Sequence, residues 1–125
     1  MGQYLIDTNT AIDFLDDKLP EKSAILIDEN EQLLSVITRM ELLAWKNATA
    51  SQLQILQDFI NNATVFGLEE SIIVKTIAIR KNYGIKLPDA IIAATALAHG
   101  LILMTRNTKD FATILDLEVL NPHDL

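Results

Sequence analysis

The stretch that decides the fold is YLIDTNTAIDFL, residues 4–15, where an apolar run ends abruptly in polar residues. The run 4–6 is typical of a buried strand, and Asp7, Thr8 and Asn9 follow it at once. Apolar residues at helical spacing resume behind them, so the stretch predicts a strand that leads directly into a helix. An acid at such a junction indicates either a helix cap or part of a site. Recurrence of the same arrangement along the chain would favour the site.

The composition limits the class of protein. The chain has 125 residues, of which 50% are hydrophobic, so we expect one domain over residues 1–125 with a substantial core. The absence of cysteine excludes a disulfide framework, Cys-bound zinc and a thiol nucleophile, and it suits a cytoplasmic protein. A net charge of −7 argues against a protein that coats nucleic acid. We expect no signal peptide, because no basic region precedes the first apolar run. We expect no membrane span, because no apolar run reaches the ~20 residues that cross a bilayer.

Apolar patterning along the chain alternates between strands and helices. Strands are predicted at 3–7, 33–38, 63–67, 101–105 and 117–121. Helices are predicted at 9–16, 20–29, 39–47, 51–60, 69–83, 88–99 and 109–115. Gly84 is expected to close one helix in a left-handed conformation. The alternation predicts an α/β fold around a mostly parallel five-stranded sheet.

The acid that follows the first strand has three counterparts. Glu41 follows the apolar run SVIT, Asp89 lies in the first turn of the helix that leads into the fourth strand, and Asp110 follows LMTRN. Each is predicted to lie near the start of a helix. Helices that follow or precede the strands of a parallel sheet begin at the same edge, where open α/β sheets bind ligands. We therefore expect Asp7, Glu41, Asp89 and Asp110 to gather there.

Four carboxylates at one edge repel one another unless a cation lies among them. Two like charges ~4 Å apart repel by roughly 4 kcal/mol at an effective dielectric near 20. A bare cluster would raise some of its own pKa values to relieve this. Mg²⁺ prefers oxygen ligands, keeps several waters and takes one or two carboxylates together with substrate phosphates. The pattern therefore favours metal-assisted hydrolysis of a phosphodiester.

Each acid also has an ordinary structural explanation. Thr38 and Glu41 fit a capping box, and residues 107–110 fit one more loosely. Asp89, directly after a proline, is a common first-turn acid, and Asp7 is a plausible N-cap. Capping alone does not require four acids around one edge, so the joint pattern favours a site.

Other polar side chains near the four acids are candidates for supporting roles. Asn9, Thr105 and Asn107 could orient a ligand water or contact a phosphate, and Arg39 and Arg106 could form a basic rim.

Several titratable residues are expected to lie outside the site. Asp13, Asp16 and Asp17 read as a solvated helix face, although Asp13 sits one helical turn from Asn9. No histidine base is proposed, because His99 is near a helix end and His123 near the end of the sequence.

Four segments occur in an order typical of one family: LIDTN, SVITRMEL, LPDAIIAATALAHG and LMTRNTKDF. At these residues the chain resembles a PIN domain, and in particular the VapC-type toxins of bacterial toxin–antitoxin pairs. The resemblance implies a three-layer α/β/α sandwich and an endoribonuclease that depends on Mg²⁺ or Mn²⁺. It implies that the four acids are catalytic metal ligands, supported by Asn9, Thr105 and Asn107. It further implies a homodimer and a cognate antitoxin that inserts a segment to block the site.

Single-stranded or structured RNA is the expected substrate, because a splayed strand can bring a phosphate to a shallow edge site. The alternative is a non-catalytic PIN-like binding module that holds a basic partner segment against its acidic edge. A phospho-acceptor receiver domain fits poorly, because the first strand is not followed by paired acids.

Overall fold

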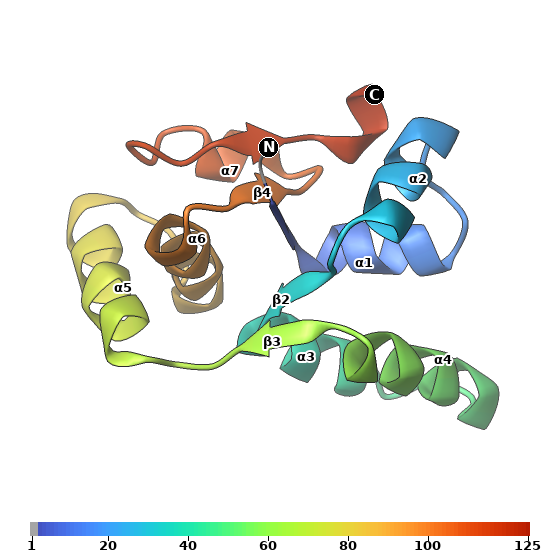
Figure 1. The fold of residues 1–125 in the computed structure, drawn as a ribbon. Coiled ribbons are helices and arrows are strands. Elements are labelled where there is room, and N and C mark those ends of the chain that lie inside the picture. Colours follow the sequence, from blue (N-terminus) through green and yellow to red (C-terminus); the bar gives the residue numbers. More distant parts are fainter. Residues whose placement is uncertain (1–2) are drawn as a thin grey trace.

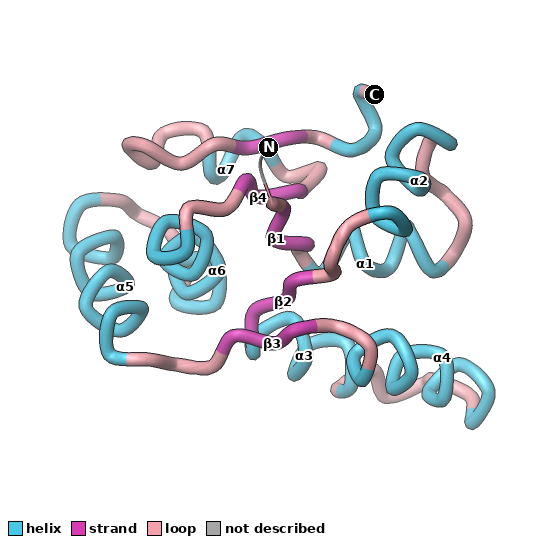
Figure 2. The backbone as a smooth tube through the Cα atoms, in the orientation of Figure 1, coloured by secondary structure: helices cyan, strands magenta, loops and turns pink. Residues whose placement is uncertain are grey.

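The centre of the protein is a sheet of five parallel strands. A computed structural model describes residues 3–125, and Figure 2 shows the strands crossing the middle of the molecule. The sheet order is β3-β2-β1-β4-β5, and each neighbouring pair is parallel. The predicted five-stranded parallel sheet is therefore confirmed. The strands are β1 Tyr4–Ile6, β2 Leu33–Ser35, β3 Thr64–Phe66, β4 Ile102–Met104 and β5 Val119–Leu120.

Helices cover both faces of the sheet, which confirms the three-layer α/β/α arrangement. α5 and α6 lie on one face, while α1, α2 and α4 lie on the other (Figure 1). The helices are α1 Thr8–Leu15, α2 Glu21–Glu29, α3 Val36–Leu43, α4 Ala50–Asn61, α5 Glu70–Asn82, α6 Leu87–His99 and α7 Thr108–Phe111, with a final 3₁₀ turn, η1, at Pro122–Asp124.

Alternate strand residues supply the two halves of the core. Leu5 and Leu103 pack toward α5 and α6, whereas Ile6 and Met104 pack toward α1, α2 and α4. This division follows from the strand period of two, which sends successive side chains to opposite faces. Both faces are covered, so the strands are continuously apolar rather than alternating.

α6 is buried on nearly all sides. Every residue of 90–96 is buried, and the alanines among them allow close approach of the sheet and α5. This packing explains the apolar run that begins at Asp89. Within residues 3–125 no helix is long and apolar enough to cross a membrane.

The second strand ends earlier than predicted. β2 ends at Ser35, whose hydroxyl accepts a hydrogen bond from the Ile37 amide and caps α3. α3 therefore spans 36–43 rather than 39–47, and the predicted capping box of Thr38 and Glu41 is wrong. The β-branched run after Ser35 favours a strand by local propensity, but the cap and tertiary packing override that weak preference.

Gly84 does not form the predicted left-handed cap. α5 ends at Asn82, and Tyr83 is already extended, with φ −133° and ψ 145°. Gly100, at the end of α6, is left-handed instead, with φ 63°. Near the end of the chain, α7 stops at Phe111 instead of continuing to 115, and the last strand is shorter than predicted.

Candidate active site

The site lies where the strand order reverses direction. From β1 the chain proceeds to β2 and β3 on one side, and later returns to β4 and β5 on the other. The crevice outside the carboxyl ends of such neighbouring strands is the usual ligand site of open α/β sheets. The β1–β4 register pairs Ile6 with Met104, so Asp7 and Thr105 follow these strands side by side.

Asp7 is held by a set of donors from both strand ends. Thr105 donates its hydroxyl hydrogen to Asp7 Oδ2 at 2.8 Å, and Asn9 Nδ2 donates to the same oxygen at 3.2 Å. The Thr8 amide donates to Oδ1 at 2.8 Å, so Asp7 also caps α1. The sequence had offered this N-cap role as the ordinary structural explanation of Asp7. These bonds occupy three of the roughly four acceptor positions of a carboxylate. One position remains for a further ligand.

Glu41 is tied to Asp7 through Thr8. The Thr8 hydroxyl donates to Glu41 Oε1 at 2.6 Å, and its oxygen lies 3.1 Å from the Thr38 hydroxyl. Glu41 is the sixth residue of α3, so it lies in the second turn and not at the helix start. Although hydrogen bonds to Asp7 lower its pKa, the pKa is raised on balance, first by burial and in smaller part by the charge of Glu41. The two acids are therefore electrostatic neighbours.

Asp89 and Asp110 line one side of the same edge. Both line a hollow of about 540 Å³ with Lys86 and Lys109. Asp89 is the third residue of α6, and Asp110 is the third of α7, where its Oδ2 accepts a hydrogen bond from Asn107 Nδ2 at 3.0 Å. Asn107 therefore contacts Asp110, one of the four acids predicted to form the site.

The charge of the other three acids acts on Asp89. Its pKa is raised, first by burial and then by the charges of Asp7, Glu41 and Asp110, while Lys86 opposes the shift. The fold therefore brings the other three acids within electrostatic reach of Asp89.

The donor set fits a hydrated divalent cation but is not a closed metal cage. Among residues 3–125, no three His, Cys, Asp or Glu side chains stand close enough together to hold an ion between them. Mg²⁺ takes one or two carboxylates and keeps its waters, unlike a tightly caged metal. Buried Asp7 and half-buried Asp89, both held in a field of like charge, fit such an ion. The assignment of all four acids as metal ligands stays a prediction.

The two arginines occupy different places. Arg39 lines a hollow with Leu43, Ile60 and Val65 and does not line the hollow of Asp89 and Asp110. Arg106 remains beside the acidic edge, because its amide donates to Asn9 Oδ1 at 3.2 Å. Arg106 is therefore the better placed of the two for a substrate contact.

Two residues that the sequence reading set aside lie close to the site. Asp13 is not on a solvated face: it is 5% exposed, and its Oδ2 lies 2.9 Å from both Arg106 Nη1 and His123 Nε2. The local sequence feature that could have indicated this was the position of Asp13 one helical turn after Asn9. The contact with His123 spans 110 residues and has no local signal.

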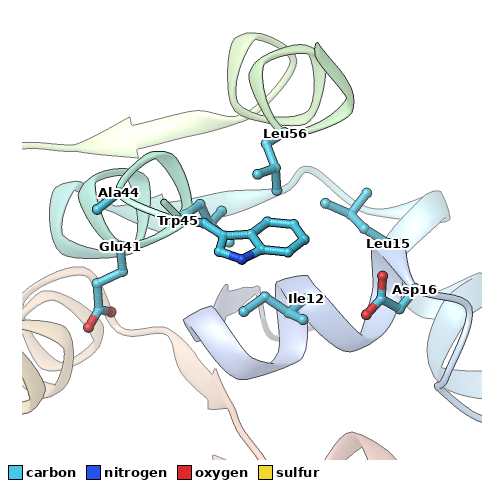
Figure 3. Close-up of a pocket in the computed structure, with 8 residues that line it drawn as sticks. Ile12, Leu15, Asp16, Glu41, Ala44, Trp45 and Leu56 are labelled. Carbon is cyan, nitrogen blue, oxygen red and sulfur yellow. The ribbon is translucent and has the colours of Figure 1, made fainter. Parts of the chain in front are cut away.

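An apolar pocket adjoins the acidic edge. It has a volume of about 390 Å³, and Figure 3 shows the Trp45 ring between Ile12 and Leu56, with the Glu41 carboxylate at one end. Trp45 is 49% exposed, so a large apolar surface faces solvent beside an acid of the site. The pocket is lined by Ile12, Leu15, Asp16, Glu41, Leu42, Ala44, Trp45 and Leu56.

Comparisons with known proteins agree with the fold. A search of curated proteins finds no match. A chain of a toxin–antitoxin complex from Klebsiella pneumoniae is 35% identical, with TM-score 0.77, over 96% of this chain and 98% of that chain. A chain of DNA-bound VapBC from Salmonella typhimurium is 25% identical, with TM-score 0.83, over 96% and 98%.

A third solved structure supports the fold alone. A chain of VapBC-1 from nontypeable Haemophilus influenzae is 24% identical, with TM-score 0.78, over 94% of this chain and 96% of that chain. The likeness to VapC-type toxins predicted from the sequence is thus confirmed. The family model of the PIN domain matches residues 4–114, which contain all four acids. This chain belongs to the PIN domain family.

Proposed function

We propose that the protein is a metal-dependent endoribonuclease and the toxin of a toxin–antitoxin pair. The observation that carries this proposal is the placement of four acids from separate elements at one edge of the sheet. Thr8 connects Asp7 with Glu41, and Asp89 and Asp110 line one hollow. A fold that gathers several carboxylates at a ligand-binding edge favours the binding of a cation there. Relatives solved as toxin–antitoxin complexes support the assignment.

Asp7, Glu41, Asp89 and Asp110 are the residues that would hold Mg²⁺ or Mn²⁺. Such an ion would supply polarisation of a phosphate and a lowered pKa of an attacking water. The chain itself orients Asp7 through Thr105 and Asn9, which fix one carboxylate oxygen from two directions.

Single-stranded or structured RNA fits the edge as a substrate. Two of the acids line a hollow at the edge of the sheet, and a splayed strand can bring a phosphate to such a site. Lys86 and Lys109 line the hollow beside two of the acids, and Arg106 lies beside Asn9. These cations offset the net charge of −7 locally and give the phosphate backbone partners.

We propose the apolar pocket beside Glu41 as the binding site of a cognate antitoxin. A segment with an apolar side chain for the Trp45 pocket and a nearby basic side chain for Glu41 would complement both features. Such a segment would also cover the acidic edge and exclude RNA. Co-expression with the product of a neighbouring small reading frame should yield a complex that RNA does not displace. We also propose a homodimer, as the family resemblance implies.

A non-catalytic binding module is the competing proposal. Residues 3–125 contain no group of three side chains that closes around a metal ion, and this favours the binding module. In that case the basic side chains of a partner peptide, and not a metal ion, would neutralise the acids. The two proposals differ in turnover. The binding module predicts metal-insensitive partner binding and no RNA cleavage.

Cleavage of RNA with Mg²⁺, with Mn²⁺ and with EDTA tests the proposed reaction. Wild-type protein should cut only with metal, and Asp89→Asn should abolish cleavage while keeping the fold. Asp28→Asn is the matched control, because Asp28 is an exposed acid on α2, away from the four acids. Equal cleavage by wild type and Asp89→Asn would refute the site assignment.

A further inference from the structure

A charged cluster lies beside the acidic edge, and only its arginine has a role in the proposed function so far. It consists of Asp13 in α1, Arg106 after β4 and His123 in η1. Asp13 Oδ2 accepts hydrogen bonds from Arg106 Nη1 and from His123 Nε2, each at 2.9 Å. A carboxylate only accepts, so Nε2 of His123 carries a hydrogen in this contact. The Asp13 side chain is 7% exposed, and a carboxylate buried to this extent needs such partners.

Arg106 is held at two points by the same face of α1. Its amide donates to Asn9 Oδ1, and its guanidinium donates to Asp13, one helical turn further on. The arginine also directly follows Thr105, which orients Asp7. Its side chain is 56% exposed, so part of the guanidinium fork remains accessible to solvent at the rim of the acidic edge.

His123 is presented by a well-anchored C-terminal turn. Pro122 is buried, and its carbonyl accepts a hydrogen bond from the Ser23 hydroxyl of α2. The Asn121 side chain caps the turn by accepting from the His123 amide at 2.9 Å. Figure 1 shows the chain end lying beside α2. The histidine thus approaches Asp13 from a fixed segment and not from a loose tail.

We propose that Asp13 and His123 are positioning residues that hold Arg106 in place to bind a phosphate of the RNA substrate. The inference rests on the proposed ribonuclease function. An arginine whose rotamer is already fixed loses less conformational freedom on binding than a mobile one. Its planar fork also suits a phosphate when its orientation is set in advance. Asp13 fixes one nitrogen and leaves the exposed part of the fork for the substrate.

Binding of a fluorescein-labelled single-stranded RNA of mixed sequence tests the proposal. Anisotropy in EDTA measures affinity without turnover, and a salt series measures the number of phosphate contacts. Asp13→Asn and His123→Ala should each weaken binding several-fold and reduce the salt slope by about 0.7, the value of one phosphate contact on a single strand. With Mg²⁺, KM should rise more than kcat falls.

Two conservative variants separate positioning from general damage. His123→Gln keeps an N–H donor toward Asp13 and should restore binding relative to His123→Ala. His99→Gln is the matched control, because His99 also faces an acid, with its Nε2 3.9 Å from Glu69, but lies at the opposite end of α6 from Asp89. It should bind RNA as wild type does.

A double-mutant comparison shows whether Asp13 acts through Arg106. In an Arg106→Ala background, Asp13→Asn should cause no further loss of RNA binding, whereas an independent structural role would add one. Folded Asp13→Asn and His123→Ala proteins that bind RNA with wild-type affinity and salt slope would overturn the inference alone. A wild type that neither binds nor cuts RNA would instead overturn the proposed function and remove the basis for this role.

Discussion

The Thr105 hydroxyl is the best point at which to test the geometry of the acidic edge. Thr105 is 0% exposed, and its hydroxyl donates to Asp7 at 2.8 Å while it accepts from Asn9 Nδ2 and the Asn107 amide, both at 3.1 Å. Thr105→Val keeps the shape of the side chain and removes all three bonds. A hydrogen bond to a charged group contributes about 1.5–3 kcal/mol, and donors left without a partner add to the loss. We expect the free energy of unfolding to fall by about 3 kcal/mol.

Thermal unfolding measures this loss directly. For a domain of this size, about 3 kcal/mol corresponds to a fall in Tm of roughly 10 °C. Thr105→Ser keeps the hydroxyl and deletes one methyl group, so it should cost only about 1 kcal/mol. Thr95→Val is the matched control, because this buried hydroxyl bonds only to the Ile91 carbonyl of its own helix. That carbonyl keeps its helical partner, so the control should be close to neutral.

The same variant has a predicted effect on metal binding. The Thr105 hydrogen bond lowers the pKa of Asp7 and so opposes the increase caused by burial. Without it, that pKa rises further, and a proton competes more strongly with a cation. The Mg²⁺ concentration needed for activity should therefore increase, most of all at acidic pH. Equal losses of stability in Thr105→Val and Thr95→Val, or in Thr105→Val and Thr105→Ser, would refute the reasoning.

Three further changes test the electrostatics and the helix ends. Burial and neighbouring charge raise the pKa of Asp89 above its ordinary 3.8, so its stabilising contribution is present at low pH and is lost as pH rises through the folded-state value. Metal-free Asp89→Asn should therefore gain stability over wild type toward neutral pH, with Asp28→Asn showing no such trend in denaturant titrations. Gly100→Ala should cost about 1 kcal/mol because φ is 63°, whereas Gly67→Ala, without a positive φ, should be neutral or slightly stabilising by calorimetry. Ser35→Ala should cost about 1 kcal/mol in urea unfolding by removing the α3 cap, and an unchanged midpoint would contradict that role.

Apolar periodicity was sufficient to predict the parallel sheet and the edge at which the acids were expected, whereas the three-layer arrangement was implied by the resemblance to PIN domains. Continuous apolar runs are typical of strands covered on both faces, and the order of elements places Asp7, Asp89 and Asp110 near helix starts. Glu41 reached the site for a different reason than predicted. α3 begins three residues earlier than expected, so Glu41 lies in its second turn. From there Glu41 accepts a hydrogen bond from the Thr8 hydroxyl, which connects it to Asp7.

Contacts between distant segments were beyond a local reading. Asp13 has two acidic neighbours nearby in sequence, Asp16 and Asp17, and the group looks like a solvated face. Only packing of α1 against the end of β4 and the C-terminal turn buries Asp13 and brings Arg106 and His123 to it. Helical spacing from Asn9 indicates a shared face but gives no partner.

Three consecutive residues after β4 connect the separate parts of the site. Thr105 bonds Asp7, Arg106 bonds Asp13, and the Asn107 side chain bonds Asp110. Each acid is thus oriented by a different residue of one short segment, whose position is fixed by β4 pairing with both β1 and β5. A shift of this segment by one residue would exchange donors among all three acids at once. Sequence changes here should therefore impair metal binding, substrate binding and stability together, whereas a change at Lys109 should mainly weaken substrate binding.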